Sequence, residues 1–180
     1  MKSLPRAQGP IGPADDFEPV YRAQAPAIYR FCLTQLRDPS AAEDAAADVF
    51  VSALRSWGRL DPNLGAKGWL FGIARNVVND HRRAQRRREL LHSLLRRATD
   101  TGWGADPQIA MGLRADVLCA GQAIARLKRR DQILVGMRIS GDLSHADIAR
   151  IVGMSEDSVR VAIHRALKRV RETLENRHVS

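Results

Sequence analysis

The sequence predicts an all-α protein that consists of two small helical bundles joined by a flexible linker, with a helix-turn-helix in the second bundle. Apolar residues recur at helical spacing along most of the chain, and no segment has a convincing strand pattern. Residues 89–107 lose this periodicity and contain the stretch ATDTGWGADP, which is typical of a linker. Residues 144–169, SHADIARIVGMSEDSVRVAIHRALKR, have the pattern of two short helices around a glycine.

These observations divide the chain into four segments. Residues 1–14 are rich in proline and glycine, and we expect them to be disordered. The first bundle is expected over residues 15–88 and the linker over residues 89–107. The second bundle, which holds the helix-turn-helix, is expected over residues 108–176.

The first bundle is predicted to contain three helices. The first begins near Asp15 and has apolar residues mostly at helical spacing. The second follows the turn Asp-Pro-Ser and is rich in alanine, with acidic residues near its start. The loop RLDPNLGAKG separates it from a third helix, which begins near Trp69 and ends in an arginine run at Arg88.

The second bundle is predicted to contain about four helices, the last two of which form the helix-turn-helix. Ala149 supplies the small residue that the helix crossing needs, and Gly153 suits a turn with positive φ. Ser144 and Asp147 form a plausible capping box, and Ser155 is expected to cap the second helix. A helical hairpin that only packs is the alternative to a DNA-binding motif.

The charge of the chain favours a polyanionic partner. The 29 Lys and Arg residues exceed the 20 Asp and Glu residues, which gives a net charge of +9. Arginine supplies most of this charge, and its planar guanidinium suits phosphates and guanine edges. From the charge alone, a basic surface without a nucleic-acid role is the alternative.

The motifs of enzymes, metal sites and cofactor sites do not occur in the sequence. The five histidines are scattered, and there is no phosphate-binding loop or metal-ligand spacing. Cys32 and Cys119 lie far apart, so we expect two small buried residues, with a redox-sensing pair as the alternative. No apolar run approaches the ~20 residues of a membrane span, and the N-terminal residues lack a signal-peptide core. We therefore expect a cytoplasmic protein without membrane insertion.

Three predicted helices have faces that suit macromolecular partners. The last helix of the helix-turn-helix has an apolar stripe opposite a face with Arg160, Val161 and Arg165, which suits the major groove of duplex DNA. The third helix of the first bundle collects arginine and asparagine on one face, which suits a single strand, with a solvated helix end as the alternative. The second helix is acidic and would repel DNA, so we expect it to bind a basic protein partner, unless its charge only stabilises the helix N-terminus.

The chain resembles a known protein family in both halves. AEDAAADVFVSALRSWGRLDP followed by GWLFGIARNVVNDHRR resembles the second conserved region of bacterial sigma factors of the extracytoplasmic-function (ECF) type. ARLKRRDQILVGMRISGDLSHADIARIVGMSEDSVRVAIHRALKRVRETL is similar to their fourth region. The resemblance extends from about Asp15 to Leu174, interrupted by the linker. It implies that the first bundle binds core RNA polymerase and captures melted bases of the −10 promoter element, whereas the second bundle reads the −35 element as duplex.

The resemblance also implies which residues make these contacts. Binding to core RNA polymerase is expected from Glu43, Asp44, Asp48, Phe50 and Leu54. Binding to −10 DNA is expected from Asp61, Asn63, Lys67, Arg75, Asn76, Asn79 and Asp80, to which the basic helix face adds Arg82 and Arg83. Binding to −35 DNA is expected from Ser158, Arg160, Val161, His164, Arg165 and Lys168, although His164 alone could equally be an ordinary surface histidine.

The sequence departs from the family pattern at three places. Lys128 stands where proline is common, Val161 and Ala162 stand where polar or basic residues are common, and Asp48 stands where Glu is usual. The resemblance implies an anti-sigma factor as a further partner and no catalytic residues in the chain itself. The alternative function is a one-component helix-turn-helix repressor or activator that does not bind polymerase.

Overall fold

The computed structural model describes residues 17–98 and 115–178, and these residues form seven α-helices and a short 3-10 helix without a strand. The predicted all-α class is confirmed. The expected disorder of residues 1–14 lies outside the described residues, as does the part of the expected linker from residue 99 to residue 107. Within the described ranges, no helix is both long enough and apolar enough to cross a membrane.

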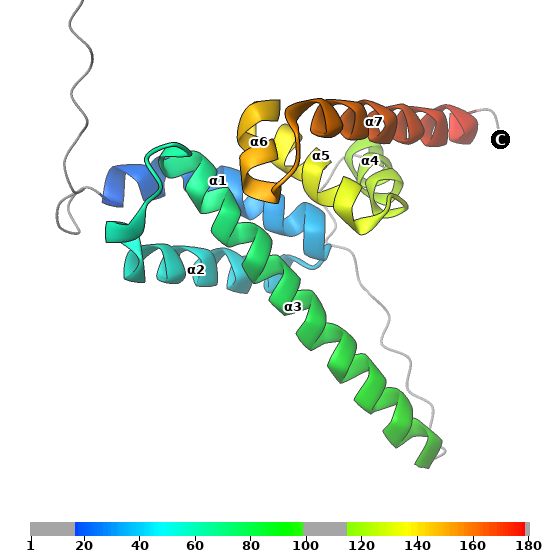
Figure 1. Ribbon diagram of the computed structural model, residues 1–180. Coiled ribbons are helices and arrows are strands. Elements are labelled where there is room, and N and C mark those ends of the chain that lie inside the picture. The colour runs from blue at the N-terminus through cyan, green and yellow to red at the C-terminus, as the bar shows by residue number, and fades with distance from the viewer. Residues whose placement is uncertain (1–16, 99–114, 179–180) are drawn as a thin grey trace, which may run out of the picture.

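The first half of the chain folds into three long helices and a single 3-10 turn (Figure 1). The second helix begins where the sequence indicates, because Asp38 is its N-cap and accepts a 2.8 Å hydrogen bond from the backbone N–H of Ala41. Pro39 occupies the first helical turn, where its missing N–H has no intrahelical partner to lose. The elements are α1 (Phe17–Leu36), α2 (Pro39–Arg55), η2 (Trp57–Arg59) and α3 (Gly65–Ala98).

Aromatic rings join these helices into one core. Phe31 of α1 meets Phe71 of α3 edge-on, with ring centroids 5.4 Å apart. Trp57 lies between Phe17 and Trp69, at centroid distances of 5.0 and 5.8 Å. Phe31 and Phe71 are fully buried, so the polar face of α3 is held on a rigid apolar base.

Helix α3 extends further than the sequence analysis predicts. The linker was expected to begin at residue 89, but the helix continues to Ala98. The stretch ELLHSLLRRA explains the difference, because it consists largely of good helix formers and contains neither Gly nor Pro. In Figure 1 the C-terminal part of α3 extends away from the rest of the molecule.

The second half of the chain contains the predicted helix-turn-helix. Ser144 accepts a 3.0 Å hydrogen bond from the backbone N–H of Asp147, and Ser155 accepts one of 3.3 Å from that of Ser158. Gly153 ends the first of the two helices at φ 71°, the left-handed conformation that the turn requires. The elements are α4 (Ala115–Ala125), α5 (Arg129–Gly141), α6 (His145–Val152) and α7 (Glu156–His178).

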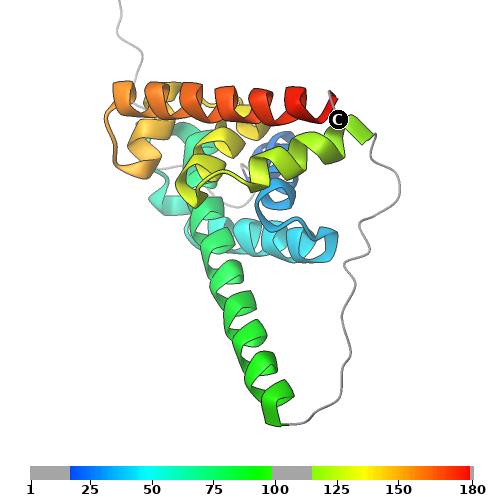
Figure 2. The same ribbon diagram turned by 90° about the vertical axis from the view of Figure 1, so that its right-hand side faces the viewer.

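The two halves of the chain share one hydrophobic core. Ile133, Leu134 and Met137 of α5 belong to the same buried cluster as Phe31 and Phe71. Figures 1 and 2 show α5 and α6 beside α1 and the first part of α3. The halves are therefore packed against each other as well as linked along the chain, a contact that the sequence analysis did not predict.

Candidate nucleic-acid and partner surfaces

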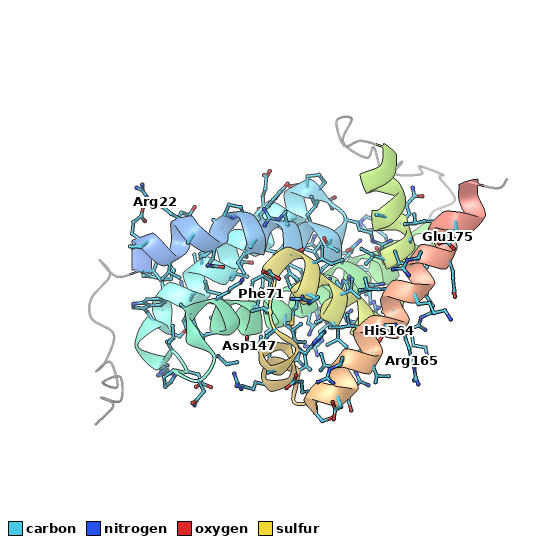
Figure 3. All side chains as sticks on the ribbon, turned by 90° about the horizontal axis from the view of Figure 1, so that it is seen from above. Arg22, Phe71, Asp147, His164, Arg165 and Glu175 are labelled. Atoms are coloured by element: carbon cyan, nitrogen blue, oxygen red, sulfur yellow. The ribbon has the colours of Figure 1, made fainter. Side chains whose placement is uncertain are left out.

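Helix α7 presents the predicted polar face to solvent. Its inward stripe includes Val159, Ile163 and Ala166, which are buried against the rest of the second half. Figure 3 shows Arg165 projecting from α7 away from the body of the molecule. The structure leaves all six residues predicted to bind −35 DNA exposed, namely Ser158, Arg160, Val161, His164, Arg165 and Lys168.

Acidic neighbours hold part of this face in place. Arg160 lies 3.2 Å from Glu156 and 3.3 Å from Asp157, measured between nitrogen and carboxylate oxygen. Val161 is 46% exposed, which is unusual for a valine on a solvated helix and leaves its methyl groups free for an apolar contact. The combination of cations with one exposed aliphatic side chain suits the floor and edges of a DNA groove.

The polar face of α3 is divided between solvent and the second half of the chain. Asn76 is exposed, and Asp80 and Arg83 form an exposed ion pair of 3.0 Å. Asp61 caps its own loop by accepting a 2.9 Å hydrogen bond from the backbone N–H of Asn63. Asn76, Asp80 and Arg83 are therefore accessible to solvent in this arrangement.

The other predicted −10 residues of α3 bond to the second half. Arg75 donates a 3.0 Å hydrogen bond to the backbone oxygen of Ile151, at the end of α6. Asn79 accepts one of 2.6 Å from Arg129, at the start of α5. Arg82 donates to the side-chain oxygen of Gln132 at 3.0 Å.

The first turn of α3 and the loop before it each make one further contact with the second half. Lys67 lies 3.5 Å from the backbone oxygen of Asp142, the limit of a hydrogen bond. Arg150 of α6 donates a 3.1 Å hydrogen bond to the backbone oxygen of Asn63. The loop and the helix that form the predicted −10 surface thus both contact the second half of the chain. The contacts are made with α5, with α6 and with the turn between them.

Arginines accumulate where α3 meets α5. Burial, together with the positive charges of Arg129, Arg37 and Arg86, lowers the pKa of Arg82 to about 10. Burial also lowers the pKa of Arg129, again with help from neighbouring arginines. Arg82 remains protonated at neutral pH, so this junction holds several cations that repel one another.

The acidic surface of α2 agrees in part with the predicted polymerase contact. Glu43, Asp44 and Asp48 are exposed, and Leu54 is 50% exposed. Phe50 does not belong to this surface, because its ring is only 9% exposed. Its ring packs edge-on against the buried ring of Phe17 and against the exposed ring of Tyr21. Tyr21 of α1 and Val51 of α2 are exposed apolar side chains that the sequence analysis did not assign to this surface.

Asp48 is also held by a neighbouring helix. Its carboxylate oxygen lies 2.8 Å from Nε2 of His81 on α3. This contact ties the acidic helix to the helix that carries the arginine and asparagine face. Among the described residues, no group of three or more His, Cys, Asp or Glu side chains could hold a metal ion.

Comparison with known proteins gives the family. The family model of sigma-70 region 2 matches residues 20–88, and that of sigma-70 region 4 matches residues 118–170. The chain is 31% identical to the RNA polymerase sigma factor CarQ of Myxococcus xanthus, with 91% of each chain covered. It is 30% identical to the ECF RNA polymerase sigma factor BldN of Streptomyces coelicolor, over 93% of this chain and 63% of BldN.

A solved structure has the same fold. The sigma factor RpoE of Bartonella quintana, in complex with the anti-sigma factor NepR, matches with a TM-score of 0.71 and 22% identity. The match covers 90% of this chain and 98% of RpoE. The chain therefore belongs to the ECF family of RNA polymerase sigma factors, which are regulatory DNA-binding proteins, and it has both region 2 and region 4.

Proposed function

We propose that this protein binds core RNA polymerase and directs it to promoters, reading the −35 element as duplex with α7 and capturing the melted −10 element with α3. The observation that carries the proposal is that one chain has two different candidate DNA surfaces. The exposed face of α7 contains cations and Val161, and the face of α3 contains arginine and asparagine. A protein that only binds duplex operators needs the first surface but not the second.

Duplex reading by α7 follows from the geometry of the helix-turn-helix. With its apolar stripe packed inward, α7 can enter the major groove with its N-terminal half. Arg165 can bind guanine through two parallel hydrogen bonds, and Val161 can contact a thymine methyl group. Lys168, nearer the C-terminus, is placed to contact a phosphate.

Capture of melted DNA by α3 follows from the side chains that it offers. Arginines neutralise the backbone of a single strand, and asparagine amides can bond the base edges that melting exposes. Unstacking a base requires a few kcal/mol, so an opened base must find a binding surface that compensates. Bond-making catalysis belongs to the polymerase in this proposal.

Polymerase binding is assigned to the acidic surface of α2. Asp44 and Asp48, with the exposed side chain of Leu54, offer negative charge beside apolar area. Such a surface is complementary to a basic and partly apolar partner. The negative charge of the α2 surface repels DNA. This surface therefore stays available to polymerase while α3 and α7 are bound to the promoter.

An anti-sigma factor is proposed as a further partner. The structural relative RpoE is held by the anti-sigma factor NepR, and its fold matches that of this chain. A protein that binds the α2 surface or the DNA surfaces would prevent initiation. A stable complex with the product of a neighbouring gene, isolated by size-exclusion chromatography, is the expected finding, and its absence for every neighbour would remove this partner from the proposal.

The experiment that tests the function is transcription in vitro from genomic fragments of the source organism. Purified protein is added to core RNA polymerase, and the 5′ ends of the transcripts are mapped. New start sites that share two upstream motifs are the expected result. Tight duplex binding that core polymerase does not change, without new transcripts, would instead support the alternative repressor or activator.

A further inference from the structure

We infer that the −10 surface of α3 is a binding surface for the second half of the same chain, and that α5 and α6 must leave it before −10 DNA can bind. This inference rests on the proposed function, because it takes the α3 face to be the −10 surface. We call the contact between α1 and α3 on one side and α5 and α6 on the other the seam.

The polar contacts of the seam use the side chains that −10 DNA would need. Arg75, Asn79 and Arg82 each hydrogen-bond to α5 or α6. The N–H groups that Arg75 donates to α6 and Arg82 donates to Gln132 of α5 cannot at the same time donate to a DNA phosphate. DNA and the second half therefore compete for one surface.

A buried glutamine pair fixes the register of the seam. Gln35 of α1 donates a 2.9 Å hydrogen bond to the backbone oxygen of Gln132. The side chain of Gln132 donates to the backbone oxygens of Ala125 and Leu127 and accepts from Arg82. Arg82 in turn donates to the backbone oxygen of Gln35. These bonds form a closed network across three helices.

Two glycines of α5 allow side chains of α1 and α3 to lie close to the helix backbone. A Cβ atom at position 136 would lie 2.6 Å from Nε2 of Gln35, and one at position 141 would lie 2.5 Å from the ring of Phe71. Glycine in the interior of a helix is less favourable than alanine, whereas glycine at the C-terminal end is common. Gly136 and Gly141 indicate that the sequence of α5 is adapted to the seam.

Other features indicate that the seam can separate. The side-chain oxygen of Gln35 is buried without a hydrogen-bond partner among the described residues. The positive charges of Arg129, Arg37 and Arg86 disfavour the charge of Arg82 at this junction. Those of Arg86 and Arg83 disfavour the charge of Arg129. These unfavourable terms oppose the apolar contacts of Ile133, Leu134 and Met137. A polyanion such as DNA would relieve the repulsion when it takes over these arginines.

The test opens the seam without changing either DNA surface. In Gly136→Ala the new methyl group must displace Gln35 or Phe31, whereas the helix α5 itself gains a better helix former. Gly121→Ala in α4 is the matched control, because a Cβ atom there meets nothing within 4 Å. Gln132→Ala is a second variant, which removes the acceptor of Arg82 and the donor to the backbone oxygens of Ala125 and Leu127 without adding charge.

Two readouts on the full chain test the inference. Hydrogen–deuterium exchange follows the amides of α1 and α5 at the seam, and fluorescence anisotropy follows binding of a labelled single-stranded −10 oligonucleotide. We expect the seam amides of both variants to exchange faster than those of the wild type. We also expect about tenfold tighter binding of the oligonucleotide, which corresponds to a wild-type protein in which the open, DNA-binding form is about one tenth of the population. The Gly121→Ala control should match the wild type, and duplex −35 binding should not change.

The results that overturn the inference are distinct from failure of the proposed function. Unchanged exchange in both variants would mean that the free protein does not form the seam. Faster exchange without tighter oligonucleotide binding would mean that the seam does not cover the −10 surface. In both cases wild-type holoenzyme would still bind a fork-shaped promoter DNA with a melted −10 element. If the holoenzyme also fails to bind that DNA, the proposed function of α3 is wrong.

Discussion

Nη2 of Arg82 on α3 donates a 3.0 Å hydrogen bond to the side-chain oxygen of Gln132 on α5, which joins the two halves of the chain. The two residues lie in different family regions, since region 2 ends at residue 88 and region 4 begins at residue 118 in the matches. The same guanidinium is predicted to bind −10 DNA. In the proposed function, recognition and domain contact therefore depend on one side chain, and variants must be chosen to separate the two roles.

Arg165→Ala tests the −35 surface. The side chain is exposed on α7, a helix that is not part of the seam. Its loss should weaken binding of a duplex −35 fragment by ~1–3 kcal/mol and relax the preference for one base pair. Binding to core polymerase should not change. The measurement is a titration at fixed ionic strength, because phosphate contacts make such affinities depend on salt.

The matched control for this prediction is Arg22→Ala. Arg22 is an exposed arginine of α1 in an ion pair with Glu18, so the variant removes the same charge from another surface. A loss of duplex affinity equal to that of Arg165→Ala would show that only net charge matters. α7 would then not be the reading helix.

Asp48→Arg tests the polymerase surface. The reversed charge should weaken association with core polymerase by about tenfold or more, a change of at least ~1.4 kcal/mol, while duplex −35 binding stays as in the wild type. Asp48→Asn separates charge from structure, because an amide oxygen can still accept from His81. The asparagine variant should lose less affinity than the arginine variant, as measured by surface plasmon resonance.

Glu175→Arg is the control for charge reversal. Glu175 is exposed near the end of α7, outside the surface assigned to polymerase. Its reversal should leave polymerase affinity unchanged.

If Asp48→Arg and Arg165→Ala abolish the same activity, the division of functions between α2 and α7 is incorrect.

Gly153→Ala tests the turn of the helix-turn-helix. Gly153 has φ 71°, and the left-handed conformation destabilises a residue with a Cβ atom by ~1–2 kcal/mol. We expect a lower midpoint of thermal unfolding and weaker −35 binding. Gly121→Ala, the same exchange in a regular helix, should not lower the midpoint. Equal midpoints for both variants would contradict the role given to Gly153.

The thiol of Cys32 should not react at neutral pH in the folded protein. Cys32 is fully buried, and burial raises its pKa to about 12, so the reactive thiolate is absent over the physiological range. Reaction with a disulfide reagent should become measurable only when denaturant exposes the residue. Rapid modification of Cys32 in the native protein would restore the redox-sensing alternative.

The helix-turn-helix was predictable because its signals are local. Ser144, Ser155 and Gly153 each act on backbone groups within three or four residues, and a single sequence contains this information. The exposed face of α7 follows from the same periodicity.

The buried position of Phe50 was missed because an apolar residue beside an acidic surface fits either a core or an interface.

The seam was not predictable from local patterns. Gln35 and Gln132 are separated by 97 positions, and nothing in either segment indicates its partner. The signals that could have suggested a contact are a glutamine within the apolar stripe of α1 and the glycines Gly136 and Gly141 in α5. Each of these marks a close approach, but none identifies what approaches.

Promoter opening is the central claim, and permanganate footprinting tests it most directly. Permanganate modifies unpaired thymines, so core polymerase with this protein should make thymines of the −10 element reactive. The double variant Asn76→Ala/Arg83→Ala alters side chains that are exposed and outside the seam. We predict that it loses most of this reactivity while it retains polymerase binding and duplex −35 binding. Full reactivity in the double variant would contradict capture of the melted strand by α3.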